Sequence, residues 1–326
     1  MFQKVPIIFN AEKLLDASFK KAAKIQIYDR STLYKNKKTI IARTDSFATN
    51  IVSNLEKYVK EFPSIENLPS FYQELIDIRV DVNKLKKSLG AVDWARKTCK
   101  MIYSKQAKSL KKSKDVDFLK QKQNEIYGRI SSVVKQVDKE LSLLSEAQRI
   151  MKKFPEIQDI PTIVIAGYPN VGKSSLLRCL SSAKPEVAQY PFTTKEIYLG
   201  HIEKTERYIT KRFQVIDTPG LLDRPDAQRN DMETQAIAAL RHLADLILFI
   251  LDASETCGYS LKDQKHLLTQ IKKIFGNTPI FIVENKVDIK RTDSDNLKIS
   301  CETREGIDLL LDEIFSHFKS DKQKIE

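Results

Sequence analysis

The stretch Gly167-Tyr168-Pro169-Asn170-Val171-Gly172-Lys173-Ser174 decides the fold of this chain. It directly follows the apolar run from Thr162 to Ala166, which predicts a buried strand, and directly precedes a helical run from Ser175 to Leu180. Two glycines let the backbone turn tightly, so that successive N–H groups point inward at a helix N-terminus. Strand, loop and helix together predict a phosphate-binding loop in a mainly parallel α/β sheet.

The second half of this loop has the residue types that a bound nucleotide needs. The Lys173 ammonium can reach the terminal phosphates, and Ser174 can place its hydroxyl on Mg²⁺, which prefers oxygen ligands. We expect the phosphates to be held by Asn170, Val171, Gly172, Lys173, Ser174 and Ser175. The spacing alone leaves ATP and GTP open.

The base is indicated by Asn285-Lys286-Val287-Asp288, at the end of a strand from Pro279 to Glu284. A carboxylate such as Asp288 accepts from both the ring N–H and the exocyclic amine of guanine, whereas adenine presents the opposite pattern. Because a buried acceptor left unpaired rejects the wrong ligand, GTP and GDP are favoured. Further contacts are expected from Lys286 along the base, from Asn285 as a brace between loops, and from backbone N–H groups at Ser300 and Cys301.

A third strand, from Arg212 to Ile216, is closed by Asp217-Thr218-Pro219-Gly220. Asp217 can hold the Mg²⁺ shell through water, and the Gly220 N–H can sense a γ-phosphate. The loop Tyr190-Pro191-Phe192-Thr193-Thr194 can supply a second Mg²⁺ hydroxyl. Four motifs in this order predict a GTP-binding domain.

Hydrolysis is expected to be slow, because apolar Leu221 and Leu222 follow Gly220 and cannot align water. An activating protein or RNA, or a bound cation, would supply the missing group. Asn170 suggests K⁺, since some GTPases with an Asn at this place use it to help hold that ion. The alternative is a turn residue that satisfies local backbone groups. Arg224 and Arg229 are further candidates, and a surface role is the alternative for both.

Length and charge divide the chain into a helical bundle domain, 1–155, and a GTP-binding domain, 156–326. The 326 residues suit two domains, and the formal net charge is +12. Residues 1–155 carry 32 Lys and Arg against 17 Asp and Glu, whereas the remainder carries 23 against 26. The basic half therefore predicts an anionic polymer or surface as partner, with nucleic acid ahead of membrane.

Apolar stripes with steps of three and four predict that the first half is an antiparallel bundle. The expected helices are near 45–61, along the stripe Leu68 to Leu89, through 92–112, and along the stripe Leu119 to Leu144. Gly90 would break two helices apart. The extreme N-terminal stretch has no clear period and would be an arm that orders on binding.

A cluster of lysines on and around the expected helix through 92–112 predicts contact with RNA phosphates, and the alternative is an ordinary solvated face. It comprises Lys84, Lys86, Lys87, Lys97, Lys100, Lys105, Lys108, Lys111, Lys112 and Lys114. Trp94 and Tyr103 could stack on bases, although aromatic residues on such a helix are more often core.

The remaining composition argues against several other kinds of site. The four cysteines and four histidines have no ligand spacing, so neither a zinc site nor a disulfide framework is expected. The apolar run near Leu246 to Leu251 is too short to span a bilayer, and no signal-peptide pattern opens the chain. We therefore expect a cytoplasmic protein without a membrane partner.

Several linked phrases resemble the Obg-like GTPases, and within them the nucleolar GTP-binding protein (Nog) subfamily. They are the segments 183–188, 190–194, 217–225 and 257–259, and Leu68-Pro69-Ser70-Phe71-Tyr72-Gln73-Glu74-Leu75 of the helical domain. The resemblance covers nearly the whole chain. The sequence ends at Glu326 without the long C-terminal extension of eukaryotic members, so we expect a minimal, archaeal-type homologue.

For the GTP-binding domain we expect a mainly parallel six-stranded sheet with helices on both faces and one edge hairpin, formed by Glu196 to Ile202 and Arg212 to Asp217. The resemblance implies a slow GTPase acting in large ribosomal subunit assembly. The helical domain would dock on rRNA of the subunit precursor in a nucleotide-dependent way. Thr194, rather than Thr193, would be the switch Mg²⁺ ligand beside Ser174, and Lys173, Thr194 and Gly220 the catalytic set. A GTP-gated protein-interaction switch and a tRNA-modification GTPase are the alternatives.

Overall fold

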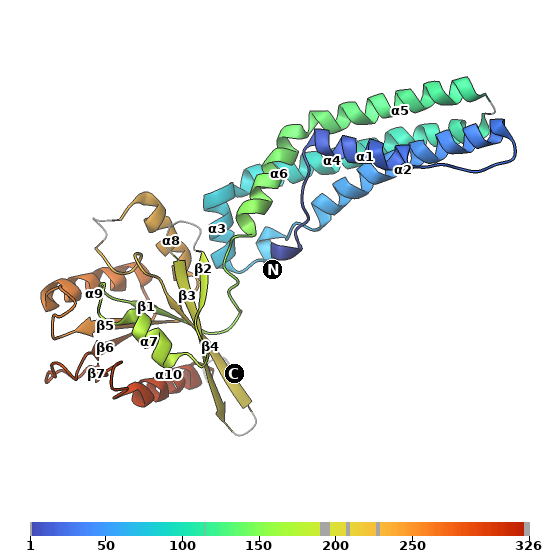
Figure 1. Ribbon diagram of the computed structural model, residues 1–326. Coiled ribbons are helices and arrows are strands. Elements are labelled where there is room, and N and C mark those ends of the chain that lie inside the picture. Colours follow the sequence, from blue (N-terminus) through green and yellow to red (C-terminus); the bar gives the residue numbers. More distant parts are fainter. Residues whose placement is uncertain (1, 114, 190–195, 207–208, 226–228, 323–326) are drawn as a thin grey trace. The chain divides into compact units, whose positions relative to one another are not determined.

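The computed structural model describes residues 2–113, 115–189, 196–206, 209–225 and 229–322. Two compact units share these residues (Figure 1). The helical unit comprises Met1–Leu68 and Ile76–Lys152, and the sheet unit comprises Pro69–Leu75 and Lys153–Glu326. The sequence placed the domain boundary after residue 155 and assigned residues 69–75 to the helical domain, so the division in space differs at both points.

The helical unit is an antiparallel bundle, as the sequence predicts. Its elements are η1 (Phe2–Lys4), α1 (Ala11–Ala23), α2 (Thr32–Lys60), η2 (Ile65–Asn67), α4 (Val82–Lys112), α5 (Val116–Gln136) and α6 (Asp138–Met151). Helix α3 (Ser70–Val80) begins in the sheet unit and ends in the helical unit. Within the bundle α2 contacts α1, α4 and α5, and α4 also contacts α5 and α6.

Buried side chains at helical spacing hold this bundle together. On α2, Phe47, Ile51 and Leu55 recur at four-residue steps and are fully buried. Such a stripe gives each helix one apolar face, and packing these faces removes them from water. Polar side chains cap the starts, because the first N–H groups of a helix lack intrahelical partners: Asn10 accepts from the Lys13 N–H and Asp115 from the Asp117 N–H.

Three helix boundaries differ from those expected. The predicted N-terminal arm forms α1 and the first turns of α2 instead. Gly90 lies inside α4 and breaks nothing; the break falls at Asp81, where φ is +65° and the carboxylate accepts from the Asn83 and Lys84 N–H groups. The stripe from Leu119 to Leu144 spans two helices, which meet at Val137.

The sheet unit is built on a mixed sheet whose order is β2-β3-β4-β1-β5-β6-β7. The strands are β1 (Thr162–Ala166), β2 (Glu186–Gln189), β3 (Glu196–Glu206), β4 (Ile209–Asp217), β5 (Leu246–Asp252), β6 (Ile280–Asn285) and β7 (Leu297–Lys298). Strands β4, β1, β5, β6 and β7 are parallel, and β2 and β3 are antiparallel to their neighbours. Within the described ranges the sheet thus has seven strands rather than the expected six. The expected hairpin, β3 with β4, is present but is not the edge, because β2 pairs outside it.

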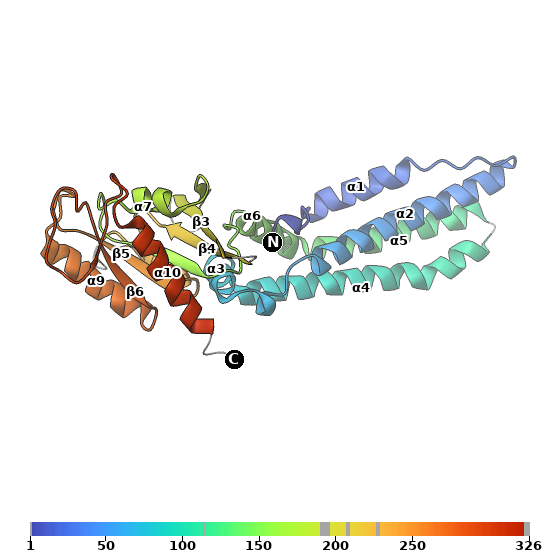
Figure 2. The same cartoon turned by 90° about the horizontal axis from the view of Figure 1, so that it is seen from below.

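Helices cover both faces of this sheet. They are α7 (Lys173–Leu180), α8 (Asp231–Arg241), α9 (Leu261–Phe275) and α10 (Ile307–Lys322). Helix α7 contacts β1, β3 and β4 and packs with α10 on one face, and α8 and α9 pack together on the other (Figures 1 and 2). Strands β1 and β5 are buried along their whole length, as is usual for parallel strands between two helical layers.

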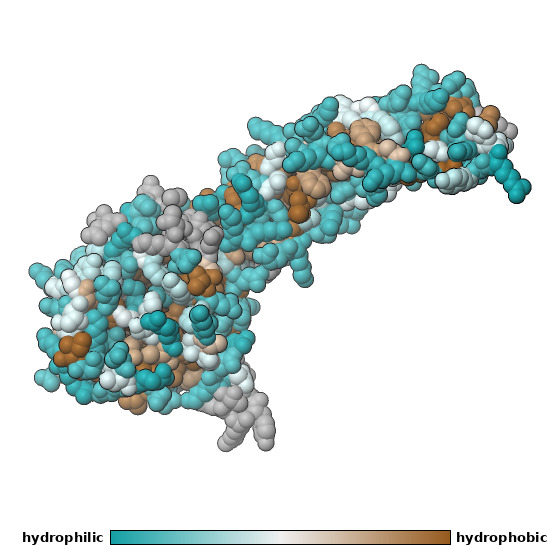
Figure 3. Space-filling model, in the orientation of Figure 1, coloured by the Kyte–Doolittle hydropathy of each residue, from teal (hydrophilic) through white to brown (hydrophobic). Residues whose placement is uncertain are grey.

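The visible surface has no large continuous apolar region (Figure 3). On the side seen in Figure 3, hydrophilic residues predominate and apolar residues form small separate patches. In the part of the chain that the structure describes, no helix combines the length and apolarity needed to cross a bilayer.

Candidate nucleotide-binding site

The phosphate loop connects the end of β1 to the start of α7. Gly172 precedes α7 with φ +105°, and Gly167 has φ +140°, both in the region that favours glycine. A Cβ at Gly167 would lie 2.7 Å from the Ile250 carbonyl oxygen, so β5 backbone leaves no room for a side chain. The Lys173 ammonium donates at 2.8 Å to the carbonyls of Gly167 and Tyr168, which holds it inside the loop.

Ser174, in the first turn of α7, and Asp217, the last residue of β4, lie in contact beside this loop. The Ser174 hydroxyl donates to Asp217 Oδ2 at 2.6 Å. The other oxygen, Oδ1, is buried without a hydrogen-bond partner among the described residues. Burial raises the pKa of Asp217 above its usual range, although Ser174 and the nearby Lys173 oppose the shift. A buried, half-satisfied carboxylate next to a hydroxyl is a suitable place for a small cation with oxygen ligands.

Asn285 joins three loops, which is the bracing role that the sequence suggested for it. Its amide nitrogen donates to the Val171 carbonyl at 2.8 Å, and its amide oxygen accepts from the Cys301 N–H at 3.1 Å. A Cβ at Gly172 would lie 2.2 Å from the Asn285 amide nitrogen. The loops after β1, β6 and β7 are therefore held in contact at the carboxyl ends of parallel strands, where open α/β sheets bind ligands.

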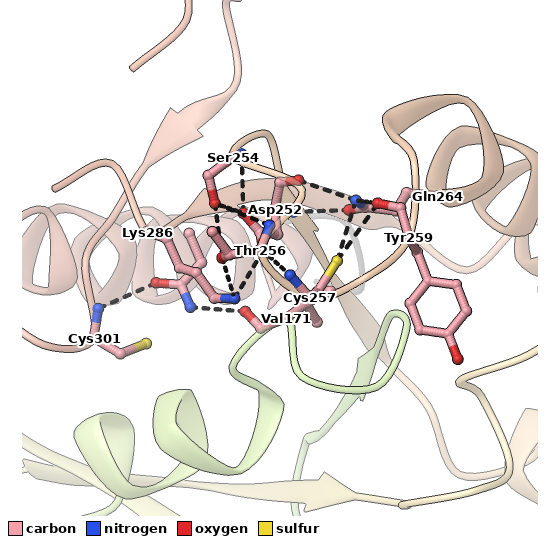
Figure 4. Close-up of polar contacts among 10 residues, drawn as sticks. Val171, Asp252, Ser254, Thr256, Cys257, Tyr259, Gln264, Lys286 and Cys301 are labelled. Atoms are coloured by element: carbon pink, nitrogen blue, oxygen red, sulfur yellow. Dashed lines mark hydrogen bonds and ion pairs between the residues drawn. The ribbon is translucent and has the colours of Figure 1, made fainter. Parts of the chain in front are cut away.

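Lys286 is fixed by a second network, on the loop after β5 (Figure 4). Its ammonium lies 2.7 Å from Asp252 Oδ2 and 2.9 Å from the Thr256 hydroxyl. Asp252 also accepts from the Ser254 hydroxyl and from the Cys257 N–H at 2.9 Å. Burial opposes ionisation of Asp252, yet the hydrogen bonds from Lys286, Ser254 and Cys257 prevail and lower its pKa. The position of the Lys286 ammonium is thereby set by side chains at the end of β5 and in the loop after it.

The residues expected around a base lie at the same edge. Asp288 is exposed beyond Lys286, whereas Ser300 is buried and its hydroxyl accepts from the Thr303 N–H at 3.1 Å. Burial raises the pKa of the Cys301 thiol to about 12, so that the thiol is neutral near pH 7. Cys301 thus offers its backbone, which already pairs with Asn285, rather than a reactive sulfur.

In the segment after β4, the charged side chains of Asp223 and Arg224 hydrogen-bond to the backbone of Gly220. The Gly220 N–H donates to Asp223 Oδ2 at 2.7 Å, and Gly220 has φ +82°. Arg224 donates to the Gly220 carbonyl at 2.9 Å and to Glu233 at 2.8 Å. The amide that the sequence assigned to a γ-phosphate is therefore occupied by a carboxylate of the same loop.

An aromatic wall stands next to the phosphate loop. The rings of Tyr168 and Tyr259 stack with centroids 4.2 Å apart. They line a cavity of about 520 Å³ together with Pro169, Asp223, Arg224, Pro225, Asp263 and His266. The Gln264 side chain donates to the Tyr259 and Asp252 carbonyls, which ties this wall to the loop that holds Lys286 (Figure 4).

Most residues singled out from the sequence are thus gathered at one edge of the sheet. Asn170 is exposed with φ +63°, Val171 is buried, and Ser175 lies in the first turn of α7. Thr193 and Thr194 lie outside the described residues, as does the loop from Tyr190. The sequence analysis missed Asp252, Thr256 and Asp223, because single acidic or hydroxyl residues in loops carry no spacing signal.

Comparison with known proteins identifies the family. The model of the NOG1 N-terminal helical domain matches residues 2–158, and the model of nucleolar GTP-binding protein 1 (NOG1) matches residues 231–288. An uncharacterised protein of Methanocaldococcus jannaschii is 38% identical over 292 residues, which are 88% of this chain and 81% of that protein.

Two further proteins are also similar. Nucleolar GTP-binding protein 1 of Saccharomyces cerevisiae is 36% identical over 241 residues, which are 74% of this chain and only 37% of the yeast protein. The crystal structure of a Plasmodium falciparum protein assigned as nucleolar GTP-binding protein 1 is 32% identical; the match covers 53% of this chain and 98% of that one, with a TM-score of 0.40. On the two family models and the sequence identities to the archaeal and yeast proteins, the chain belongs to the nucleolar GTP-binding protein 1 family.

Proposed function

We propose that the chain binds GTP and GDP, hydrolyses GTP slowly, and acts in assembly of the large ribosomal subunit in the cytoplasm. The observation that carries the nucleotide part is the loop at the start of α7, where the Lys173 ammonium is held by 2.8 Å hydrogen bonds to the Gly167 and Tyr168 carbonyls and the Ile250 carbonyl leaves Gly167 no room for a Cβ. Nucleolar GTP-binding proteins among the relatives support the choice of GTP. The assembly role rests on the family and on the basic helical unit.

In this proposal different site residues contact the phosphates and the base of the nucleotide. The backbone N–H groups from Asn170 to Ser175 surround the phosphates, and the Lys173 ammonium leaves its two carbonyls to reach the terminal ones. The Lys286 stem lies against the base. Exposed Asp288 accepts from guanine, and the Ser300–Cys301 backbone faces its carbonyl. Asn285 holds the loops in register.

The residues fit a bound Mg²⁺ ion. Ser174 Oγ and Asp217 lie 2.6 Å apart, and the orphaned Asp217 Oδ1 has unused acceptor capacity. Ser174 would ligate the metal directly, Asp217 through water, and Thr194 from the switch loop. When bound, Mg²⁺ neutralises phosphate charge during transfer. A cation there would also relieve the cost of the buried carboxylate.

Slow hydrolysis follows from the residues after Gly220. Leu221 and Leu222 are both buried, so neither side chain can orient water. Arg224 is tied to Glu233 and to the Gly220 carbonyl, which directs it away from a role as a free catalytic cation. We propose that the missing group comes from an activating protein or RNA, or from K⁺ beside exposed Asn170. An Arg supplied by a partner accelerates such reactions about 10³- to 10⁵-fold.

Docking of the helical unit on rRNA of the subunit precursor completes the proposal. Residues 1–155 carry the whole excess of positive charge. Phosphate contacts made by such a unit would give strongly salt-dependent binding. Nucleotide dependence would arise because γ-phosphate contacts order the segments around Gly220 and Thr194, and hydrolysis releases them.

Two variants test the nucleotide part. Lys173→Ala should abolish tight binding of GTP and GDP, and Asp288→Asn should shift preference from guanine towards xanthine, because the amide donates where the carboxylate accepts. Fluorescence titration with GTP, GDP, ATP, XTP and XDP measures both. Equal affinity of the unmodified protein for GDP and XDP would contradict the assignment of the base site.

The assembly part is tested by sedimentation with ribosomal particles from the same cells, at low and high salt, in GDP and in a non-hydrolysable GTP analogue. Nucleotide-dependent association with the large subunit or its precursor is expected. Absence from every ribosomal fraction in both states would overturn the assembly role. If the chain instead associates with a protein in a GTP-dependent way, and nuclease treatment does not abolish that association, a GTP-gated protein-interaction switch would be favoured.

A further inference from the structure

Helix α4 presents one long exposed stripe that the bundle leaves uncovered. The stripe, here called the α4 face, consists of Lys87, Trp94, Lys97, Met101, Lys105, Lys108 and Lys112, all exposed. Steps of three, four and seven residues place them on one side of the helix. At about 1.5 Å per residue the stripe is about 37 Å long. The opposite side of α4 is buried and includes Leu85, Val92 and Cys99.

The charge of the α4 face is one-sided and largely uncompensated. Asp93 is the only acidic residue in α4, and it already pairs with Arg96 and Lys97. Lys87, Lys105, Lys108 and Lys112 have no ion pair within the described ranges. Like charges at helical spacing repel one another, so an anionic partner with repeated charges would relieve a cost that the free protein carries.

Trp94 lies within this stripe and is 49% exposed, although an aromatic residue on such a helix was expected to be core. Tyr103, the other aromatic candidate on α4, is used internally: its hydroxyl donates to Asp45 at 2.7 Å, and burial together with Asp45 raises its pKa. The Trp94 ring is therefore half exposed to solvent, one turn from Lys97 and two turns from Lys87 and Met101.

We propose that the α4 face binds an unpaired RNA strand, with the lysines on its phosphates and the Trp94 ring stacked on a base. This inference rests on the proposed RNA docking of the helical unit and assigns it to one surface. Proteins that bind single-stranded nucleic acid combine a basic track with aromatic platforms, and this stripe has both. Side chains read bases most readily where the bases are unstacked, because the major groove of an RNA duplex is deep and narrow.

Two other occupants fit less well. A protein partner would need a contiguous apolar core in its interface, and the stripe has only Trp94 and Met101, which are separated by Lys97. A membrane surface would need the apolar side of an amphipathic helix, and that side of α4 is packed inside the bundle. An acidic protein segment remains as an outcome of the test.

The chain contains a single tryptophan, so intrinsic fluorescence of the whole protein reports on Trp94 alone. The experiment titrates the unmodified full chain with a 20-nucleotide single-stranded RNA of mixed sequence, a 20-base-pair RNA duplex, and poly-glutamate. The single strand should quench Trp94 and bind with strong salt dependence, and the duplex should quench it less. Quenching by poly-glutamate but not by RNA would overturn the proposal in favour of an acidic protein.

Variants separate the α4 face from general basicity. The triple variant Lys105→Ala, Lys108→Ala, Lys112→Ala should weaken RNA binding and flatten its salt slope by about 2, since each phosphate contact on a single strand contributes about 0.7. The matched control is Lys13→Ala, Lys21→Ala, Lys139→Ala, which removes the same charge from exposed positions on α1 and α6. The control should bind within about twofold of the unmodified protein if non-specific charge contributes little.

Trp94→Ala should weaken RNA binding about tenfold, whereas Trp94→Phe should retain most of the affinity because a phenyl ring still stacks. If both triple variants bind RNA with equal affinity, and Trp94 fluorescence does not change when RNA is added, the α4 face is not the RNA-binding surface. RNA docking by another part of the helical unit would still stand. If the unmodified protein binds no RNA even at low salt, the proposed docking function itself fails along with the surface.

Discussion

Asp217 shows how one residue of the candidate site is unfavourable for the fold. Its carboxylate is buried and its pKa is raised, chiefly by burial. A raised pKa in the folded state means that the unfolded chain loses its proton first, so stability falls as pH rises above the ordinary Asp value. The folded protein therefore contains a destabilising buried carboxylate, whose Oδ1 has no hydrogen-bond partner among the described residues.

We therefore predict that Asp217→Asn stabilises the nucleotide-free protein and weakens Mg²⁺-dependent GTP binding. The melting temperature should rise by about 2–4 °C at pH 7 and by less at pH 4, close to the ordinary Asp pKa, where the unfolded chain also keeps much of its proton and the buried carboxyl costs less. Calorimetry at the two pH values, without nucleotide, measures the first effect. A variant that melts below the unmodified protein at both pH values would contradict this account of Asp217.

Asp223 occupies the Gly220 amide at 2.7 Å, and a γ-phosphate would compete for the same donor. We predict that Asp223→Asn raises the affinity for a GTP analogue relative to GDP by about tenfold, because a neutral amide oxygen is a weaker acceptor than a carboxylate. Stopped-flow binding of both nucleotides measures the ratio. Asp263→Asn, on the wall of the same cavity, is the control and should leave the ratio unchanged; equal shifts in both variants would rule out competition at Gly220.

For the helices and strands, the sequence predicted the type of each element better than the residues at which it begins and ends. The buried strands β1 and β5 and the loop of Gly167 to Ser174 follow from local apolar runs and glycines, and the structure confirms them. The break before α4 was missed because Asp81, not Gly90, adopts positive φ, and the gain from its cap to Asn83 and Lys84 is visible only in three dimensions. The contacts of Asp252 with Lys286 were missed because they join residues 34 positions apart.

Gly90 gives a test of α4 as an uninterrupted helix. It lies in the helix interior, and an added Cβ would meet no atom within 4 Å. We predict that Gly90→Ala raises the free energy of unfolding by about 0.5–1 kcal/mol, because alanine loses less backbone freedom in a helix. Urea unfolding followed by far-UV circular dichroism measures this. A destabilised variant would indicate that α4 bends at Gly90 and needs glycine there.

For the molecule as a whole, the covalent path between the units is the feature that bears on nucleotide control. Helix α3 begins in the sheet unit, where Tyr72 donates to the Pro155 carbonyl and accepts from the Ile157 N–H, and it ends in the helical unit. Nucleotide contacts belong to the sheet unit, and the basic charge belongs to the other. If RNA affinity depends on nucleotide state, a continuous α3 is a stiff route by which one unit can influence the other.

We predict that Asp77→Pro, in the second half of α3, uncouples the two activities. Proline removes a helical N–H and clashes with the carbonyl four residues earlier, at a cost of about 3 kcal/mol or more. Asp77→Ala is the matched control, since it also loses the contact of Asp77 with the Val82 N–H but keeps the helix. RNA affinity measured in GDP and in a GTP analogue should differ for the Ala variant and become equal for the Pro variant, with nucleotide binding retained in both. A Pro variant whose RNA affinity still follows the nucleotide would show that the signal does not pass along α3.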